Sequence, residues 1–474
     1  MGFFTQTLGT EGWGLCAYVS AITTISVLVD VGFGEGGWIY LSRGEVQGKS
    51  AGVWQIWGTF IRLAVVHAFL GMILVWILGY FLDKDRSSTS HQLFLYGGIY
   101  AALQLIVIAI GQFLASNRSF KTLATMNMIA STLGNIVALI LIARDPQPPY
   151  YMIGLIMGAG TAILYGVFHI RKSRSGQPKY GFDRDLAKEF VLLGRRNYLS
   201  RLFQMAALHG DTVLLGQAFS KEMVTHYSNS KRLPDGFSDL IGQLRQAVQS
   251  DLAKDHVAGD QQFANSVDRY SRIALGLSVC FLLVPSAFGA VILPLWFQDK
   301  AYQGGAVVMF GMALYRTFEQ CFSTYGGAMS VALKPQYLIA PILWNGIATL
   351  CFTIPMAKWL GVEGLALMNV SIDVLQWLPL VWLMSKLIAP GLEIWAHLRK
   401  AASILAVGLG ISLGSFFLMN TPYFQAHKLV GIALIPVMSF ITGAIVFGLG
   451  MAPTPEAVVL RLRKIHPKIV QRMR

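Results

Sequence analysis

The chain has 474 residues, of which 54% are hydrophobic and only 13% are charged. Because a soluble domain carries about 25% charged residues, this composition excludes a soluble globular protein and indicates one embedded in a membrane. The formal net charge of +14 does not indicate nucleic-acid binding, since Lys and Arg are spread over many loops, where they act as topology signals and contacts with anionic lipid.

Apolar segments long enough to cross a bilayer follow one another along the whole chain. A helix of about 20 apolar residues matches the hydrocarbon thickness, and only helices and closed barrels satisfy their own backbone polar groups in lipid. The segments are too long and too uniformly apolar for barrel strands, so we predict an all-α polytopic membrane protein. In chain order the pattern predicts about thirteen spans, which are Trp13–Tyr40, Trp57–Leu82, His91–Ala115, Leu123–Ala143, Tyr150–Ile170, Tyr198–Phe219, Val224–Leu252, Ile273–Phe297, Gly304–Met329, Tyr337–Lys358, Val362–Leu387, Ala401–Met419 and Leu429–Met451.

Basic residues are concentrated in alternate loops of this arrangement. One set of loops contains Arg43 and Lys49, the long segment 171–196 and the C-terminal tail 452–474, whereas the loops between them contain few basic residues. Since cytoplasmic loops carry the excess of Lys and Arg, we expect this set, and with it the C-terminus, to be cytoplasmic.

The span Val224–Leu252 is much more polar than the others, yet the charge pattern requires it to cross the membrane. If it did not cross, every later basic loop, including the tail, would move to the outer side and contradict the first half of the chain. An amphipathic helix that lies along the membrane surface is the alternative interpretation. Pro234, inside this span, predicts a kink.

A helical projection of the same span places most of its polar side chains on one face. Among apolar neighbours, such a face predicts a water-filled cavity between helices. Lys231 precedes Asp235 by four residues, a spacing that allows a local ion pair. The predicted polar face consists of Ser228, Lys231, Arg232, Asp235, Asp239, Gly242, Arg245, Gln246 and Gln249.

Other ionisable residues fall within the predicted spans. An ionisable residue inside the membrane is a functional candidate by default. Burial can bring the pKa of a carboxylate into the range where the group carries a coupling proton or sodium ion. Arg316 and Glu319 are three residues apart and can pair. We expect no metal or other cofactor, because no Cys and His residues have the spacing of a zinc site. The ion-coupling candidates are Asp30, Glu35, Asp211, Asp235, Asp239, Glu319 and Asp373.

The sequence also carries a faint internal repeat. Glu11 and Tyr18 have counterparts in Glu222 and Tyr227, at a separation of about 210 residues, which fits six spans per repeat. An even number of spans per repeat gives both halves the same orientation. Because only ten residues precede Glu11, we expect the first half to lack its opening helix.

The predicted organisation is therefore two six-helix lobes, the first without its opening helix, followed by two extra C-terminal helices. The expected divisions are an N-terminal transmembrane lobe over 1–170, a basic cytoplasmic loop over 171–197, a C-terminal transmembrane lobe over 198–388, a two-helix unit over 389–451 and a basic cytoplasmic tail over 452–474.

Several short motifs resemble a known family of transporters. Residues 8–15 (LGTEGWGL), Tyr18 and residues 30–34 (DVGFG) resemble the opening motif of the Wzx-like oligosaccharide flippases. These proteins form a polysaccharide transport family within the multidrug/oligosaccharidyl-lipid/polysaccharide exporter superfamily. Residues 211–227 and 361–366 resemble the start of that family's second lobe and a later turn.

The resemblance implies a transporter and not an enzyme. It would move polyprenyl-diphosphate-linked oligosaccharide repeat units from the inner to the outer leaflet of a bacterial inner membrane by alternating access. Charge-assisted contacts from Lys231, Arg232 and Arg245 suit the diphosphate, and Ser228 and the glutamines suit the sugar hydroxyls. The candidate substrate-cavity residues are Ser228, Lys231, Arg232, Arg245, Gln246, Gln249 and Arg316.

Three alternatives stay open. The first two are a multidrug exporter and a lipid II-type exporter of the same superfamily. The third is a membrane polysaccharide polymerase, although the long hydrophilic loop at 171–196 is on the expected cytoplasmic side, whereas polymerases display a large outer loop. The partners that we expect are the lipid-linked oligosaccharide, membrane lipids and the polysaccharide assembly machinery, with no nucleic acid.

Overall fold

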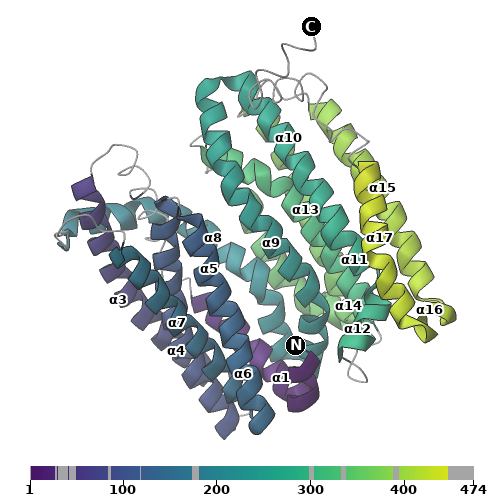
Figure 1. Ribbon diagram of the computed structural model, residues 1–474, viewed down its shortest axis with the longest axis horizontal. Coiled ribbons are helices and arrows are strands. Elements are labelled where there is room, and N and C mark those ends of the chain that lie inside the picture. Colours follow the sequence, from purple (N-terminus) through teal and green to yellow (C-terminus); the bar gives the residue numbers. More distant parts are fainter. Residues whose placement is uncertain are drawn as a thin grey trace. The chain divides into compact units, whose positions relative to one another are not determined.

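The computed structural model describes residues 2–26, 50–83, 87–117, 119–172, 181–297, 304–331, 338–387 and 394–446, together with the single residues 29 and 41. Within those residues every regular element is a helix (Figure 1). This confirms the predicted all-α class.

The described helices follow one another along the chain. The first part of the chain contains α1 (Gly2–Ile25), α3 (Ser50–Leu82), α4 (Ser88–Ser116), α5 (Phe120–Met128), the π-helical turn η2 (Ile129–Leu133), α6 (Gly134–Arg144), α7 (Pro149–Lys172) and α8 (Arg184–Ala218). The second part contains α9 (Lys221–Ala258), α10 (Asp260–Ser278), the π-helical turn η3 (Val279–Leu283), α11 (Val284–Ser286), α12 (Gly289–Phe297), α13 (Gly305–Val331), α14 (Ile339–Leu387), α15 (Ile394–Met419), α16 (Pro422–Ala426) and α17 (Lys428–Val446).

Among the described residues, seven helices are long and apolar enough to cross a membrane, and a pair bent by 61° brings the number to eight. This confirms a multi-pass membrane protein. The bent pair covers the predicted span Ile273–Phe297. The seven helices are Trp54–Leu82, Ser88–Ser116, Phe120–Arg144, Pro149–Lys172, Ile339–Gln376, Leu398–Met419 and Lys428–Val446. The described parts of the remaining predicted spans also fold as helices, namely α1, α8, α9 and α13, but these do not meet the same test.

Particular residues set where the helices begin and bend. Asp183 precedes α8 and accepts hydrogen bonds from the backbone N–H groups of Asp185 (3.0 Å) and Leu186 (3.1 Å), which satisfies donors that a helix start leaves free. Gly361 interrupts α14 with a φ of 70°, a left-handed conformation that glycine adopts without steric cost. This break falls between the predicted spans Tyr337–Lys358 and Val362–Leu387.

By packing, the chain divides into two compact units. Unit 1 lies within Met1–Asn229, Trp296–Tyr302 and Ile339–Leu365, and unit 2 within Ser230–Leu295, Gln303–Leu338 and Ala366–Arg474. Each has its own apolar core. Representative fully or almost fully buried core residues are Phe60, Ile110, Phe113 and Phe190 in unit 1, and Leu252, Phe263, Leu282, Tyr325 and Met329 in unit 2. The domain divisions expected from the sequence describe repeats rather than packing and stay predictions.

Candidate functional site

The polar helix α9 carries most of the charged residues predicted to form a site. It continues for 38 residues through Pro234, a length of about 57 Å at 1.5 Å per residue. Its first turns belong to unit 1 and the rest to unit 2, because the division falls between Asn229 and Ser230. Tyr227, near its start, and Leu252, near its end, are both buried, so α9 packs within each unit.

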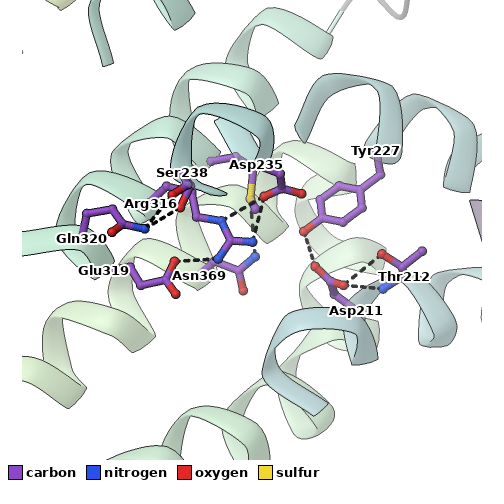
Figure 2. Close-up of polar contacts among 10 residues, drawn as sticks. Asp211, Thr212, Tyr227, Asp235, Ser238, Arg316, Glu319, Gln320 and Asn369 are labelled. Carbon is purple, nitrogen blue, oxygen red and sulfur yellow. Dashed lines mark hydrogen bonds and ion pairs between the residues drawn. The ribbon is translucent and has the colours of Figure 1, made fainter. Parts of the chain in front are cut away.

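In unit 2, Arg316 of α13 lies at the centre of an ionic cluster (Figure 2). Its Nε and Nη2 donate to the same oxygen, Oδ1 of Asp235 on α9, at 2.9 and 2.8 Å. Its Nη1 donates to Oε2 of Glu319, on its own helix, at 2.6 Å. The Arg316 side chain is only 11% exposed, against 28% for Asp235 and 26% for Glu319. The predicted pairing of Arg316 with Glu319 is confirmed.

The charges around this cluster nearly balance. Three groups make direct contact, one guanidinium and two carboxylates, which leaves a formal charge of −1 on the trio. Lys231, one turn before Asp235 on α9, attracts that carboxylate electrostatically. The ion pair that the four-residue spacing allows stays a prediction. Arg232 also attracts it, whereas Asp239, one turn later, repels it. Charges inside a membrane protein are retained where they pair or face water.

Neutral polar contacts join the same two helices next to the ionic cluster. Nε2 of Gln320 on α13 donates to Oγ of Ser238 on α9 at 2.7 Å, and to the carbonyl of Ser238 at 3.2 Å. Both residues are about 95% buried. On α14, Nδ2 of Asn369 contacts Sδ of Met312 at 3.6 Å, and Asp373, one turn further along α14, is buried.

In unit 1, a second buried carboxylate joins α8 to α9. Asp211, which is 2% exposed, accepts a hydrogen bond from the hydroxyl of Tyr227. Its other oxygen accepts from the backbone N–H and the hydroxyl of Thr212, at 2.5 and 3.1 Å. Asp211 is an ion-coupling candidate from the sequence, and the structure surrounds it with hydroxyl donors (Figure 2).

The structure places the other predicted site residues in different ways. Ser228 and Lys231 are half-buried, whereas Arg232 and Asp239 are exposed. Leu240, which directly follows Asp239 on α9, is 59% exposed. Asp30 and Glu35 lie outside the described residues, as do the side chains of Arg245, Gln246 and Gln249.

Sequence reasoning missed four residues that complete these clusters, namely Thr212, Tyr227, Ser238 and Gln320. Tyr227 had a signal, because it recurs in the internal repeat opposite Tyr18, but that signal gave no partner. The Gln320–Ser238 contact joins residues 82 positions apart, so no local spacing could predict it.

These features define a class of protein: a multi-pass helical membrane protein with charged residues on helices of its buried interior. The sequence matches the family model described as "Polysaccharide biosynthesis protein" over residues 5–297. Because the match covers more than half of the chain, the chain belongs to that family. None of the curated proteins compared with it matches the sequence.

Solved structures of transporters share the fold. A structure described as "Lipid II flippase MurJ, inward closed conformation" has 14% sequence identity and a TM-score of 0.66, with coverage of 94% of this chain and 96% of that one. An inward-facing multidrug resistance MATE family transporter of the MOP superfamily has 14% identity and a TM-score of 0.62, covering 81% and 93%. The Vibrio cholerae MATE transporter VcmN, in the bent form, has 15% identity and a TM-score of 0.55, covering 85% and 95%. These structures show that the chain has the fold that the sequence motifs implied.

Proposed function

We propose that the protein translocates polyprenyl-diphosphate-linked oligosaccharide repeat units across the bacterial inner membrane by alternating access, for polysaccharide export. The proposal rests on one combination: a polysaccharide biosynthesis family match over residues 5–297 on a transporter fold. No chemistry on the bound sugar is needed, so the protein acts as a transporter and not as an enzyme, with its C-terminus in the cytoplasm.

The ionic residues of α9 and α13 support this substrate class. A diphosphate cannot cross hydrocarbon unaided and needs charge-assisted partners in a site from which bulk water is partly excluded. Lys231, Arg232 and Arg245 of α9, together with Arg316 of α13, supply cations on two neighbouring helices. Ser228, Gln246 and Gln249 supply hydrogen-bonding groups for the sugar, while the polyprenyl chain stays in lipid.

A coupling ion completes the proposal. Several carboxylates lie on helices of this membrane protein, where a proton or a sodium ion is the simplest ion for them to bind. They are Asp211, Asp235, Asp239, Glu319 and Asp373. Asp30 and Glu35 are further candidates from the sequence. Transport driven by such an ion requires no other cofactor. The membrane lipids and the polysaccharide assembly machinery are the expected partners.

The test is restoration of surface polymer in cells that lack their own flippase for the same repeat unit. A triple variant with Lys231→Gln, Arg232→Gln and Arg245→Gln removes three positive charges from α9 and is expected to abolish polymer. The control triple, Lys121→Gln, Arg184→Gln and Lys188→Gln, removes the same formal charge from exposed positions and is expected to retain it. Full polymer from the α9 triple, with protein levels equal, would refute the diphosphate role.

Export of organic cations is a second candidate, favoured by one observation. The direct contacts of the unit 2 cluster hold two carboxylates for one guanidinium, and an excess of negative charge suits a cationic load. The MATE relatives are described as multidrug transporters. Expression in a drug-sensitive host separates the two: increased resistance to cationic dyes without polymer restoration would favour this candidate.

A further inference from the structure

One membrane span of unit 1 carries a row of uncharged polar side chains. The helices α5 and α6, with the π-helical turn η2 between them, form the single span Phe120–Arg144. Asn127, Ser131 and Asn135 recur on it every four residues, so they lie above one another on one side of the helix. Asn127 and Ser131 are exposed and Asn135 is half-buried. We call these three residues the polar row.

The packing of the span fixes the direction in which the polar row points. Gly134 and Ala138 are buried. A Cβ built on Gly154 of α7 would lie 2.5 Å from the backbone nitrogen of Ala138 and 2.6 Å from the carbonyl oxygen of Gly134, so this side of the span is in tight contact with α7. Asn135 directly follows Gly134 and is therefore turned about 100° away from that contact. The polar row lies beside the helix contact and not within it.

The exposed surface of the span has a polar side and an apolar side. The apolar side consists of residues that are between 43% and 60% exposed, namely Met128, Ile136, Leu139 and Ile140, with Thr132 between the first two. Apolar side chains are stable against lipid chains, whereas an amide in hydrocarbon loses the hydrogen bonds that it makes with water. The polar row therefore requires water or a polar ligand beside it.

The hydrogen bonds of the polar row leave an acceptor free for a ligand. The hydroxyl of Ser131 donates to the carbonyl of Asn127 at 3.0 Å, and Nδ2 of Asn135 donates to the carbonyl of Ser131 at 2.7 Å. The second bond fixes the orientation of the amide, since only its nitrogen can donate to a carbonyl. Oδ1 of Asn135 is buried and accepts no hydrogen bond from the described residues. A hydroxyl group of a ligand can donate to this oxygen, whereas a diphosphate, which only accepts, cannot.

The polar row runs from the cytoplasmic half of the span to its middle. The alternation of basic loops predicts that residues 117–119, before the span, are cytoplasmic. At 1.5 Å per residue, Asn127 lies about 10 Å and Asn135 about 22 Å along the helix from Phe120. The π-helical turn Ile129–Leu133 falls between them, and such turns occur frequently at functional sites. The polar row therefore begins at the depth of the inner leaflet, where a lipid-linked sugar is made available to a flippase.

We propose that the polar row lines a water-filled path, open to the cytoplasm, along which hydroxyl groups of the oligosaccharide pass from the inner leaflet into the transporter. The inference rests on the proposed function and adds to it, because it assigns contacts with the sugar to unit 1. Uncharged acceptors suit a sugar because they replace the water that its hydroxyl groups lose, without attracting or repelling a charge.

Single cysteines in the polar row test whether it meets water. Cys16, Cys280, Cys321 and Cys351 are first replaced by alanine, and Asn127→Cys or Ser131→Cys is then introduced. Inverted vesicles, which present the cytoplasmic face, are treated with a membrane-impermeant maleimide. The controls are Met128→Cys and Ile136→Cys, which lie at nearly the same depth on the apolar side. Because a thiol reacts as the thiolate, which forms in water and not in hydrocarbon, the polar-row cysteines are expected to label about tenfold faster than the controls.

The role in sugar transport is tested by the rate at which surface polymer appears after induction. Asn135→Leu removes the free acceptor and is expected to slow this rate about fivefold. Ile136→Leu, at the next residue on the apolar side, is the matched control and is expected to leave the rate unchanged. Ser131→Ala, with an expected loss of about threefold, decides the matter if Asn135→Leu does not reach the membrane.

Equally slow labelling of the polar-row and control cysteines would overturn the inference, as would unchanged polymer rates in both Asn135→Leu and Ser131→Ala. Disulfide cross-links between two copies through Ser131→Cys would also overturn it, because a second copy would then cover the row. A parent chain that restores no polymer would instead refute the proposed function. The labelling needs no substrate, so in that case it still decides whether the polar row meets water.

Discussion

Arg316 of α13 donates two hydrogen bonds to a single carboxylate oxygen of Asp235, 81 residues earlier on α9, and its Nη1 donates to Glu319. Because one guanidinium serves two carboxylates, its removal leaves two negative charges without their cation, whereas removal of either carboxylate leaves a matched pair. The three residues are therefore unequal, and Arg316 is the one on which the other two depend.

Arg316→Gln is expected to destabilise the protein more than Asp235→Asn. An unmatched buried charge costs about 3–5 kcal/mol, and loss of a hydrogen bond to a charged group costs about 1.5–3 kcal/mol. The shift of the thermal unfolding midpoint in one detergent measures both. Lys188→Gln serves as the control, since Lys188 pairs with Asp185 on the exposed surface of α8 with side chains 66% and 88% exposed, where a pair is worth about 0.2–1 kcal/mol. Equal shifts for Arg316→Gln and Asp235→Asn would contradict the ranking.

Gln320→Leu is expected to weaken the contact of α9 with α13 without any change in charge. It removes both hydrogen bonds to Ser238, and such bonds between membrane helices are worth about 0.6 kcal/mol each, with a maximum of about 1.7 kcal/mol. Gln261→Leu, at an exposed position of α10, is the matched control. If the two variants unfold at the same temperature in detergent, the Gln320 contact contributes nothing to stability.

Tyr227→Phe is expected to destabilise the pairing of α8 with α9 by about 1–3 kcal/mol, because it leaves an oxygen of buried Asp211 without that donor. Asp211→Asn is expected to cost less, since an amide oxygen still accepts from Thr212 while the amide N–H donates to the hydroxyl oxygen of Tyr227. Tyr423→Phe, at a residue that is 59% exposed, should change the unfolding temperature little. An unchanged unfolding midpoint for Tyr227→Phe in the same assay would contradict this prediction.

Gly158→Ala is expected to separate α7 from the preceding helix. A Cβ there would lie 2.4 Å from the carbonyl oxygen of Ala130, and overpacking against backbone costs about 1–3 kcal/mol. Gly160→Ala, two residues along α7, has nothing within 4 Å of the added Cβ and is expected to stabilise by about 0.5–1 kcal/mol through helix propensity. Unfolding midpoints that do not move in opposite directions would show that this close approach is unimportant.

The parts of the candidate site that could be predicted are contacts between residues three or four positions apart on one helix. Arg316 and Glu319 lie three residues apart on one helix, so helix geometry alone brings them together. The attraction between Lys231 and Asp235 follows from a four-residue spacing in the same way. The partner of Asp211 could not be found like this, because Tyr227 lies on the next helix and faces Asp211 only through the way α8 packs on α9.

The sequence by itself determined the class of this protein and the order of its helices. Apolar segments of bilayer length must form helices in lipid, and this constraint holds whatever the neighbouring helices do. It also determined the break at Gly361, because a glycine between two apolar segments accepts a backbone conformation that other residues avoid. The motifs of the first half indicated a polysaccharide family, and the family match over residues 5–297 agrees with that.

Only the tertiary structure decided which residues meet. The Gln320–Ser238 hydrogen bond and the ion pair of Asp235 with Arg316 join positions 82 and 81 residues apart in the chain. Each depends on how closely two helices approach and at what register, which is set by the sum of many side-chain volumes. A single sequence shows the volumes but not their arrangement, so the clusters of the site became visible only once the helices were packed.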